Sequence, residues 1–330
     1  MTPRIHGGTD ALGPARWDFS SNANACGPCP LALQAVQQAD ATRYPDPSYT
    51  RLRAALADLH GVEAARVLPA ASASEAIQRL TAWRARAGDR RVWTPPHAYG
   101  DYAHAASAWG LERVAGPALA QLVWLCDPGS PLGQGESGAA VQAALEGAVR
   151  TGVLDCAYAP LRLRGASALD PAQRDRVWQL WSPNKALGLT GVRAAYAIAP
   201  RGSEAAVAAL QALAPSWPIG AHGQALLLAW AQPAVQDWVA ASRTTLAAWA
   251  QDLRALLARH GWTCAPSDTA FGCARPPRPL DATALRARGV KLRDATSFGL
   301  PGWWRLSAQQ PPALAALDEA LQEQQGEAVR

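Results

Sequence analysis

Short apolar segments alternate with segments of helical periodicity through the middle of the chain, and this alternation limits the possible fold more than any other feature. Strands that alternate with helices form a mostly parallel sheet with helices on both faces. The predicted strands are residues 66–69, 91–94, 121–126, 151–154 and 177–181, and the predicted helices are residues 48–60, 72–86, 99–109 and 138–150. The pattern therefore predicts an α/β fold whose ligand lies at the carboxyl ends of the strands, where such sheets open a crevice.

Both ends of the chain differ from this middle part. Residues 1–48 are rich in Gly, Pro, Asn and Asp, which predicts a mostly irregular arm. After residue 221 the strand signals fade, and helical periodicity and short strand-like pieces follow; the predicted helices are residues 223–232, 233–260 and 312–324. We expect an amino-terminal arm that forms part of a small domain (1–44), a large domain (45–230) and a carboxy-terminal small α+β domain (231–330).

Composition and charge argue against several other classes of protein. Hydrophobic residues make up 49% of the chain, too many for a disordered protein, and no apolar run is long enough to span a membrane. The formal net charge of +5 is spread along the chain without a basic, aromatic-interleaved stretch, so no nucleic-acid partner is expected. The six cysteines are scattered and the amino terminus lacks a secretory signal pattern. These features predict a cytoplasmic enzyme with reduced thiols and no membrane partner.

Only two lysines occur in the chain, and one of them lies in a chemically informative segment. Lys185 follows a predicted strand, with Ser182 three residues before it and Arg193 eight residues after it. A lysine amine can form a Schiff base with an aldehyde cofactor. A hydroxyl and a guanidinium beside it suit a phosphate, because arginine presents a planar fork of donors to phosphate oxygens.

Two further segments fit the same cofactor. Asp155 and Tyr158 end a predicted strand and can reach one crevice. Pyridoxal phosphate needs a carboxylate at its pyridinium nitrogen so that the ring acts as an electron sink, and a tyrosine can bond the phenolic oxygen. The small residues at 70–75 lie between a strand and a helix, where free backbone N–H groups bind anions.

These segments, in this order and over nearly the whole chain, resemble the class I/II aminotransferase family of fold-type I pyridoxal-phosphate enzymes. The resemblance implies the aspartate aminotransferase fold, with a large domain whose mostly parallel sheet is flanked by helices and a smaller α+β domain. It implies that Lys185 carries the cofactor, that Asp155 pairs with the ring nitrogen and that Tyr158 binds the phenolic oxygen. It further implies phosphate ligands at Ser72, Ala73, Ser74, Ser182 and Arg193, ring stacking by Tyr99, a substrate carboxylate on Arg305, and a homodimer in which Tyr44 reaches the phosphate site of the neighbouring subunit.

The amino-terminal arm carries a narrower resemblance. His6, followed by two glycines, and the segment 18–24, which ends at Asn24, are similar to L-threonine-O-3-phosphate decarboxylases of the cobalamin pathway. Those enzymes and the related histidinol-phosphate aminotransferases bind an amino compound that carries a phosphate. The resemblance implies substrate contacts from His6, Asn24, Arg293 and Arg305. The leading hypothesis is decarboxylation of L-threonine O-3-phosphate to (R)-1-aminopropan-2-yl phosphate, and the alternative is an aminotransferase of the histidinol-phosphate type.

Several positions depart from the family pattern, among them Ala25 and Pro183, and two departures bear on the reaction. Ser130 stands where the family has an asparagine that helps to hold the phenolic oxygen, and a shorter hydroxyl could still bond there, directly or through water. Asn184 replaces the small residue that usually precedes the lysine. The two departures motivate a minor hypothesis, a catalytically impaired scaffold that binds pyridoxal phosphate.

Overall fold

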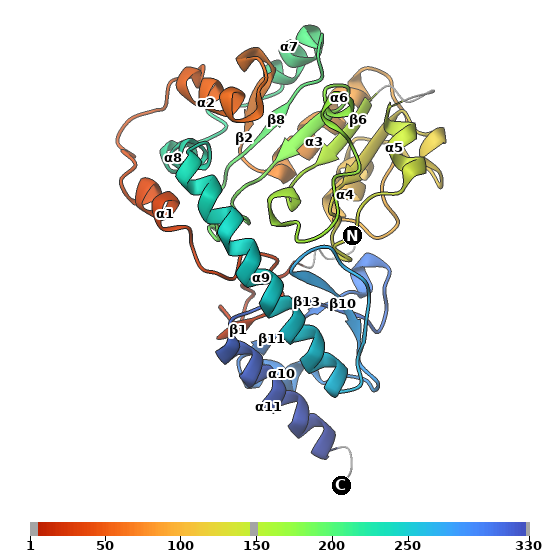
Figure 1. Ribbon diagram of the computed structural model, residues 1–330. Helices are drawn as coiled ribbons and strands as arrows, with labels where there is room; N and C mark the ends of the chain where they lie inside the picture. The colour runs from red at the N-terminus through yellow and green to blue at the C-terminus, as the bar shows by residue number, and fades with distance from the viewer. Residues whose placement is uncertain (1–5, 146–150, 328–330) are drawn as a thin grey trace.

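The computed structural model describes residues 6–145 and 151–327, and its largest element is a seven-stranded mixed sheet (Figure 1). The strand order is β2-β8-β7-β6-β5-β3-β4. Only β8 runs antiparallel to both of its neighbours, β2 and β7. The strands are β2 (Val67–Ala70), β3 (Arg91–Trp93), β4 (Glu112–Arg113), β5 (Leu122–Cys126), β6 (Thr151–Asp155), β7 (Trp178–Trp181) and β8 (Ala195–Ile198). The predicted α/β class, with a mostly parallel sheet, is confirmed.

Helices cover both faces of this sheet. On β5, Leu122 and Trp124 pack into one apolar cluster while Val123 and Leu125 pack into another. Because successive side chains of a strand point to opposite faces, every residue of β5 and β6 is buried. The covering helices are α2 (Thr50–His60), α3 (Ala73–Arg86), α4 (Gly100–Ala108), α5 (Gly138–Leu145), α6 (Pro171–Arg174), α7 (Glu204–Ala212) and α8 (Ala221–Trp230).

Most of the predicted elements are confirmed, with differences of a few residues at their ends. The helix predicted at 138–150 is present as far as Leu145, and residues 146–150 lie outside the described residues. The arm predicted as mostly irregular contains helix α1 (Pro30–Gln37), which packs against α8. Pro30 occupies the first turn of α1, where a helix does not need its missing N–H. The sequence prediction took Pro30 and its neighbours for turn residues and therefore missed this short helix.

The carboxy-terminal part of the chain forms a smaller α+β unit below the large sheet in Figure 1. Helix α9 (Pro233–Arg259) runs from one part to the other, since its residues belong to the apolar clusters of both. The four-stranded sheet has the order β12-β13-β10-β9, and β1 pairs with β11 in a separate two-stranded sheet. The elements are β1 (Trp17–Asp18), β9 (Thr263–Cys264), β10 (Phe271–Arg275), α10 (Ala282–Ala287), β11 (Val290–Lys291), β12 (Arg293–Asp294), β13 (Trp304–Ser307) and α11 (Pro311–Glu327).

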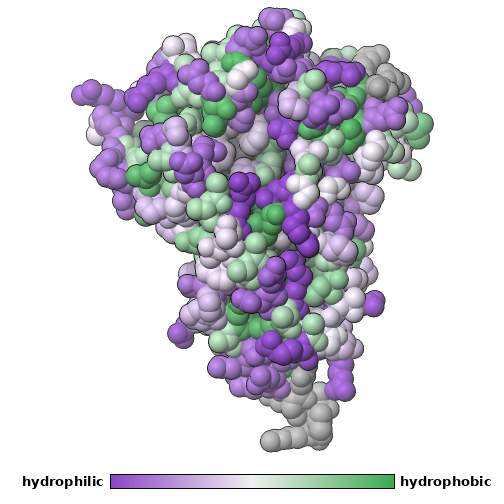
Figure 2. Space-filling model, in the orientation of Figure 1, coloured by the Kyte–Doolittle hydropathy of each residue, from purple (hydrophilic) through white to green (hydrophobic). Residues whose placement is uncertain are grey.

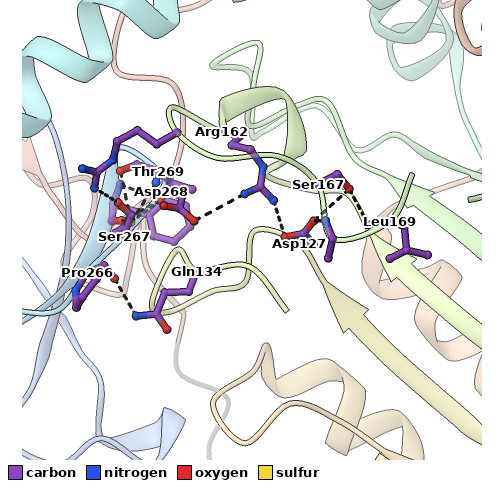
Figure 3. Close-up of polar contacts among 12 residues, drawn as sticks. Asp127, Gln134, Arg162, Ser167, Leu169, Pro266, Ser267, Asp268 and Thr269 are labelled. Carbon is purple, nitrogen blue, oxygen red and sulfur yellow. Dashed lines mark hydrogen bonds and ion pairs between the residues drawn. The ribbon is translucent and has the colours of Figure 1, made fainter. Parts of the chain in front are cut away.

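An ion-pair cluster joins the two parts next to the carboxyl end of β5 (Figure 3). Arg162 lies 2.5 Å from a carboxylate oxygen of Asp127 and 3.8 Å from one of Asp268. Asp127 also accepts hydrogen bonds from Ser167 and from the backbone N–H of Ala168. Asp127 directly follows β5 and Asp268 precedes β10, so Arg162 holds the edge of the large sheet against the small one.

The surface of the molecule mixes polar and apolar residues across both parts, as the face in Figure 2 shows. Within residues 6–145 and 151–327, no helix combines the length and the apolar character that crossing a membrane requires. All six cysteines are free thiols, and four of them are buried.

Candidate active site

A cavity of about 1320 Å³ lies at the carboxyl ends of β5, β6 and β7, where the sheet topology predicted a crevice. Its walls come from three separate stretches of the chain. The large sheet and the amino-terminal ends of α3 and α4 form one wall, the arm from His6 to Asn22 forms a second, and the small sheet with Phe298 forms the third. The cavity therefore depends on the contact between the two parts of the molecule.

Lys185 lies in the turn that follows β7 and lines this cavity. Its Nζ is 5.1 Å from the centroid of the Tyr158 ring. The backbone N–H of Gly188 bonds to the carbonyl of Lys185, and that carbonyl also accepts a hydrogen bond from the N–H of Asn24. Gly188 has a φ of +66°, and a Cβ there would lie 2.5 Å from the carbonyl oxygen of Gly27. The glycine thus lets the lysine segment and the amino-terminal segment pack closely.

Asp155 ends β6 with its side chain buried. The Tyr102 hydroxyl donates a 2.6 Å hydrogen bond to Oδ2, and the backbone N–H of Ala157 donates one of 2.9 Å to Oδ1. Burial raises the pKa of the Asp155 carboxyl, while these two hydrogen bonds and the positive charge of Lys185 oppose the rise. A buried carboxylate of this kind gains from a cationic partner in the cavity.

Hydroxyl groups gather near the amino terminus of α3. Ser72 caps this helix by accepting a hydrogen bond from the N–H of Glu75, and Ser74 bonds to the hydroxyl of Tyr99 at 3.0 Å. Ser182 is buried, and its Oγ has no hydrogen-bond partner among the described residues. Ser182 and Arg193 line the same cavity as Ser72 and Ser74. An anion with several oxygens fits here, because the helix terminus, the hydroxyls and the guanidinium all provide donors.

Two arginines of the small sheet lie near the Phe298 ring. The guanidinium carbons of Arg293 and Arg305 are 4.9 and 5.6 Å from the ring centroid. Arg305 donates to Ser130 at 3.1 Å and to the carbonyl of Ser20 at 2.5 Å. Burial and the neighbouring Arg305 lower the pKa of Arg293 to about 10, so Arg293 remains positively charged at neutral pH.

The arm reaches the cavity through residues 6–9. The His6 ring lies 6.0 Å from the Tyr99 ring, measured between centroids. Gly7 packs against the carbonyl oxygen of Ser20 so closely that no Cβ would fit. Glycine at position 7 is therefore required for His6 to approach the cavity along this path.

Thirteen of the fifteen residues predicted for the site line this one cavity, and Tyr44 and Asn24 do not. The Tyr44 side chain is 79% exposed and stacks on Trp217 at 4.4 Å. The structure does not bring Asn24 to the cavity, because its buried amide donates to the Ala186 carbonyl and the Ser242 hydroxyl. Asn22, two residues earlier in the same segment, lines the cavity instead.

Sequence reasoning missed Asn22 and Tyr102. Asn22 lies within the segment singled out at 18–24, but a bend at residue 23 separates it from Asn24, and Asn24 rather than Asn22 was predicted for the site. Tyr102 follows Tyr99 by three residues, the spacing that places two side chains on one helix face. That spacing was the available signal.

The groups around the cavity fit pyridoxal 5′-phosphate. The buried Asp155 carboxylate suits a protonated ring nitrogen, and the unpartnered buried hydroxyl of Ser182 suits a phosphate oxygen. Lys185 lines the same cavity, where an amine can attach an aldehyde. The fold and this arrangement define a fold-type I enzyme that uses pyridoxal 5′-phosphate.

Comparison with known proteins places the chain in one family. The family model described as aminotransferase class I and II matches residues 16–322. Histidinol-phosphate aminotransferase from Ruegeria sp. (strain TM1040) is 31% identical, over 92% of this chain and 90% of that protein. The chain belongs to the class I and II aminotransferase family, as its sequence motifs indicated.

Solved structures share the fold at lower identity. Histidinol-phosphate aminotransferase from Sinorhizobium meliloti, in complex with pyridoxal-5′-phosphate, has a TM-score of 0.74 at 23% identity and covers 92% of this chain and 89% of its own. L-threonine-O-3-phosphate decarboxylase from Porphyromonas gingivalis has a TM-score of 0.75 at 20% identity and covers 92% and 98%. At these identities the likeness establishes the fold alone.

Proposed function

We propose that the protein is an aminotransferase of the histidinol-phosphate type, which transfers an amino group between a phosphate-bearing amine and a keto acid. The observation that carries the proposal is the pair Arg293 and Arg305, two guanidiniums in the cavity of Lys185. Each presents a planar fork that suits a phosphate or a carboxylate. Relatives at 30–31% identity that are named histidinol-phosphate aminotransferase support transamination better than decarboxylation.

The residues have separate roles in this proposal. The bound cofactor supplies an electron sink for the substrate Cα. Asp155 holds negative charge at the ring nitrogen, Tyr158 and Ser130 bind the phenolic oxygen, and the amine of Lys185 moves the proton at Cα as base and then as acid. The residues that would hold the phosphate of the cofactor are Ser72, Ala73, Ser74, Ser182 and Arg193, and Tyr99 would stack on its ring.

The substrate is bound from the opposite wall. Arg305 holds a carboxylate, and Arg293 and His6 hold a phosphate, since all three line the side of the cavity formed by the small sheet and the arm. A guanidinium that bonds an anion contributes about 1.5–3 kcal/mol. Arg293→Gln should therefore raise the KM of a phosphate-bearing substrate roughly 10- to 150-fold.

Decarboxylation of L-threonine O-3-phosphate is the second candidate, and His6, Gly7 and Gly8 at the cavity favour it. These residues carry the resemblance of the arm to the decarboxylase subgroup. The same cavity would perform that reaction if it held the carboxylate bond of Cα, rather than the C–H bond, perpendicular to the cofactor ring. The product would be (R)-1-aminopropan-2-yl phosphate, a cobalamin building block.

Two assays on one preparation separate the candidates. With histidinol phosphate and 2-oxoglutarate we expect glutamate to form, and with threonine phosphate we expect no release of carbon dioxide. Release of carbon dioxide from threonine phosphate, without formation of glutamate in the other assay, would refute the aminotransferase proposal and support the decarboxylase. Turnover in either assay would dispose of the impaired scaffold, whereas none with any amino donor would support it.

The proposed working unit is a homodimer in the cytoplasm. The exposed ring of Tyr44 would complete the phosphate site of a second copy, since it lies outside the cavity of its own chain. The six free thiols accord with a reducing compartment.

A further inference from the structure

Position 130 lacks the asparagine of the family pattern, but the side-chain amide of another residue, Asn22, lies beside Ser130. Asn22 lies just after β1, is 6% exposed and lines the cavity. Its Nδ2 donates to the Tyr158 hydroxyl at 3.2 Å and to Ser130 Oγ at 3.4 Å. An asparagine from the amino-terminal arm thus contacts both hydroxyls expected at the phenolic oxygen of the cofactor.

Hydrogen-bond accounting shows what this contact does to Ser130. A hydroxyl has one hydrogen to donate and two lone pairs that accept. Ser130 Oγ accepts from Asn22 and, at 3.1 Å, from Nη1 of Arg305. Both of its lone pairs are therefore occupied by N–H donors, and only its own hydrogen is left for a ligand.

The same accounting applies to Tyr158. Its oxygen accepts the hydrogen bond from Asn22, so its own hydrogen points to another partner. Tyr158 and Ser130 both line the cavity that contains Lys185. A ligand oxygen that lies between the two hydroxyls would receive two donated hydrogens.

We propose that Asn22 is a positioning residue that turns Tyr158 and Ser130 into hydrogen-bond donors toward the phenolic oxygen of the cofactor. The chain thereby replaces the amide missing at position 130 with one from its arm. The inference rests on the cofactor placement proposed above and is independent of the substrate.

The consequence is a spectroscopic one. Hydrogen bonds donated to the phenolic oxygen stabilise its anionic form, so they lower the pH at which the linkage between Lys185 and the cofactor loses its proton. Removing them raises that pH. Other charged and titratable groups lie around Tyr158 and Ser130, and the variants below leave them unchanged. These groups are Asp18, Tyr99, Asp155, Arg293 and Arg305.

The test is a pH titration of the visible absorption of the holoenzyme. We expect Asn22→Ala to raise the midpoint by about one pH unit, the effect of losing one hydrogen bond. Asn22→Asp should raise it further, because a carboxylate accepts the two hydroxyl hydrogens instead of donating to their oxygens. Adding Ser130→Asn to Asn22→Ala should return the midpoint toward that of the wild type, since it restores an amide donor.

Asn24→Ala is the matched control. The Asn24 amide is also buried in the arm but bonds to the Ala186 carbonyl and the Ser242 hydroxyl, away from the cavity. We expect a lower melting temperature and an unchanged midpoint. An unchanged midpoint in Asn22→Ala, or equal midpoint shifts in Asn22→Ala and Asn24→Ala, would overturn the proposal.

The same titration separates this inference from the proposals on which it rests. A wild-type absorption that Lys185→Ala leaves intact would overturn both the cofactor placement and the role of Asn22. A normal wild-type titration with no activity on any amino donor would refute the proposed function alone. In that case a midpoint shift in Asn22→Ala would still support the role of Asn22.

Discussion

The hydroxyl of Tyr102 donates a 2.6 Å hydrogen bond to Oδ2 of Asp155, at the inner end of the cavity. The Tyr102 ring is stacked on Trp124 of β5, with 4.9 Å between centroids and 18° between the ring planes. Neither ring has room to turn, since both are fully buried. Tyr102 therefore fixes the orientation of the carboxylate that is expected to face the ring nitrogen.

We expect Tyr102→Phe to destabilise the cofactor-free protein by about 1.5–3 kcal/mol at neutral pH, because the lost hydrogen bond involves a charged group. Burial raises the pKa of Asp155 above its ordinary 3.8, and the Tyr102 hydrogen bond opposes that rise, so the pKa is higher still in the variant. The deficit should be smallest in acid, where both folded proteins hold a protonated carboxyl, and grow only as the pH rises through the raised pKa of the wild-type Asp155 carboxyl. Urea unfolding across the pH range measures it.

Tyr49→Phe is the matched control for this prediction. Tyr49 is also a buried tyrosine, but its hydroxyl bonds only to uncharged groups: it donates to the carbonyl of Ile219 at 2.5 Å and accepts from the N–H of Ile219 at 3.1 Å. We expect a loss of about 1–3 kcal/mol that does not vary with pH in the acid range. A Tyr102→Phe deficit that is equally flat with pH would contradict the coupling to Asp155.

Lys185 should carry the cofactor, and the shortage of lysines makes this prediction simple to check. Borohydride reduction of the holoenzyme should fix the cofactor to the peptide that contains Lys185 and leave Lys291 unmodified. Lys291 is already held by Asp10 and the carbonyl of Gly8, both at 2.5 Å. Lys185→Ala should lower the rate about 10²–10⁴-fold, the range for losing a positioned acid–base group. Peptide mass mapping that finds the label on Lys291 would reassign the site.

The sequence was sufficient for the central sheet because both of its faces are buried. β5 is wholly apolar and β6 is buried along its whole length around an apolar centre, so their apolar runs located them to within a few residues. β8 was not predicted, since its four residues follow the lysine segment without a helix to separate them. α1 was missed because turn residues surround it, and tertiary packing against α8 stabilises it.

The site was predictable where one segment carries its own chemistry, as at Lys185 and Asp155. It was not predictable where a role depends on how distant segments pack. Asn22 reaches Tyr158 only because β1 pairs with β11 and brings the arm across the small sheet. Nothing in the local sequence distinguishes Asn22 from Asn24, and only the packing shows which amide faces the cavity.

Tyr44 should act on the cavity of a second subunit, which subunit mixing can show. Lys185→Ala should lose most of its activity, as argued above, and Tyr44→Ala should bind the cofactor roughly 10- to 150-fold more weakly, the effect of one lost phosphate contact. After the two variants exchange subunits, each mixed dimer contains one complete site. We expect roughly a quarter of wild-type activity at equal concentrations. A mixture no more active than its components would contradict the shared site.

Glu136 should make stability fall as the pH rises toward neutral. Its carboxyl accepts a 2.8 Å hydrogen bond from the N–H of Cys126, and burial, with the nearby charge of Asp127, raises its pKa from 4.5 to about 7. An acid whose pKa is higher when folded stabilises the protein fully below 4.5 and loses that contribution by about pH 7. Glu136→Gln keeps the hydrogen bond and removes the charge.

Glu136→Gln should therefore be more stable than the wild type above pH 7, by up to about 3 kcal/mol. In acid the free energies of unfolding of the two proteins should differ less. Melting temperatures of both proteins from pH 4 to 9 provide the comparison. Parallel curves would show that the Glu136 carboxyl titrates normally.

Gly188 should be the least replaceable residue of the lysine segment. Its φ of +66° costs an L side chain about 1–2 kcal/mol, and a Cβ would lie 2.5 Å from the carbonyl oxygen of Gly27, a backbone atom that cannot rotate away. We expect Gly188→Ala to destabilise the cofactor-free protein by about 2 kcal/mol or more. The displaced segment should also bind the cofactor more weakly, because Gly188 bonds to the carbonyl of Lys185.

Gly191→Ala is the control within the same segment. No heavy atom lies within 4 Å of its Cβ position and its φ is not positive, so its stability should change by less than about 1 kcal/mol. Urea unfolding of the two cofactor-free variants measures the difference. Equal stability of the two variants would mean that the Gly27 segment moves without a cost in free energy. The close packing of the arm against the lysine turn would then have no role in holding Lys185 in place.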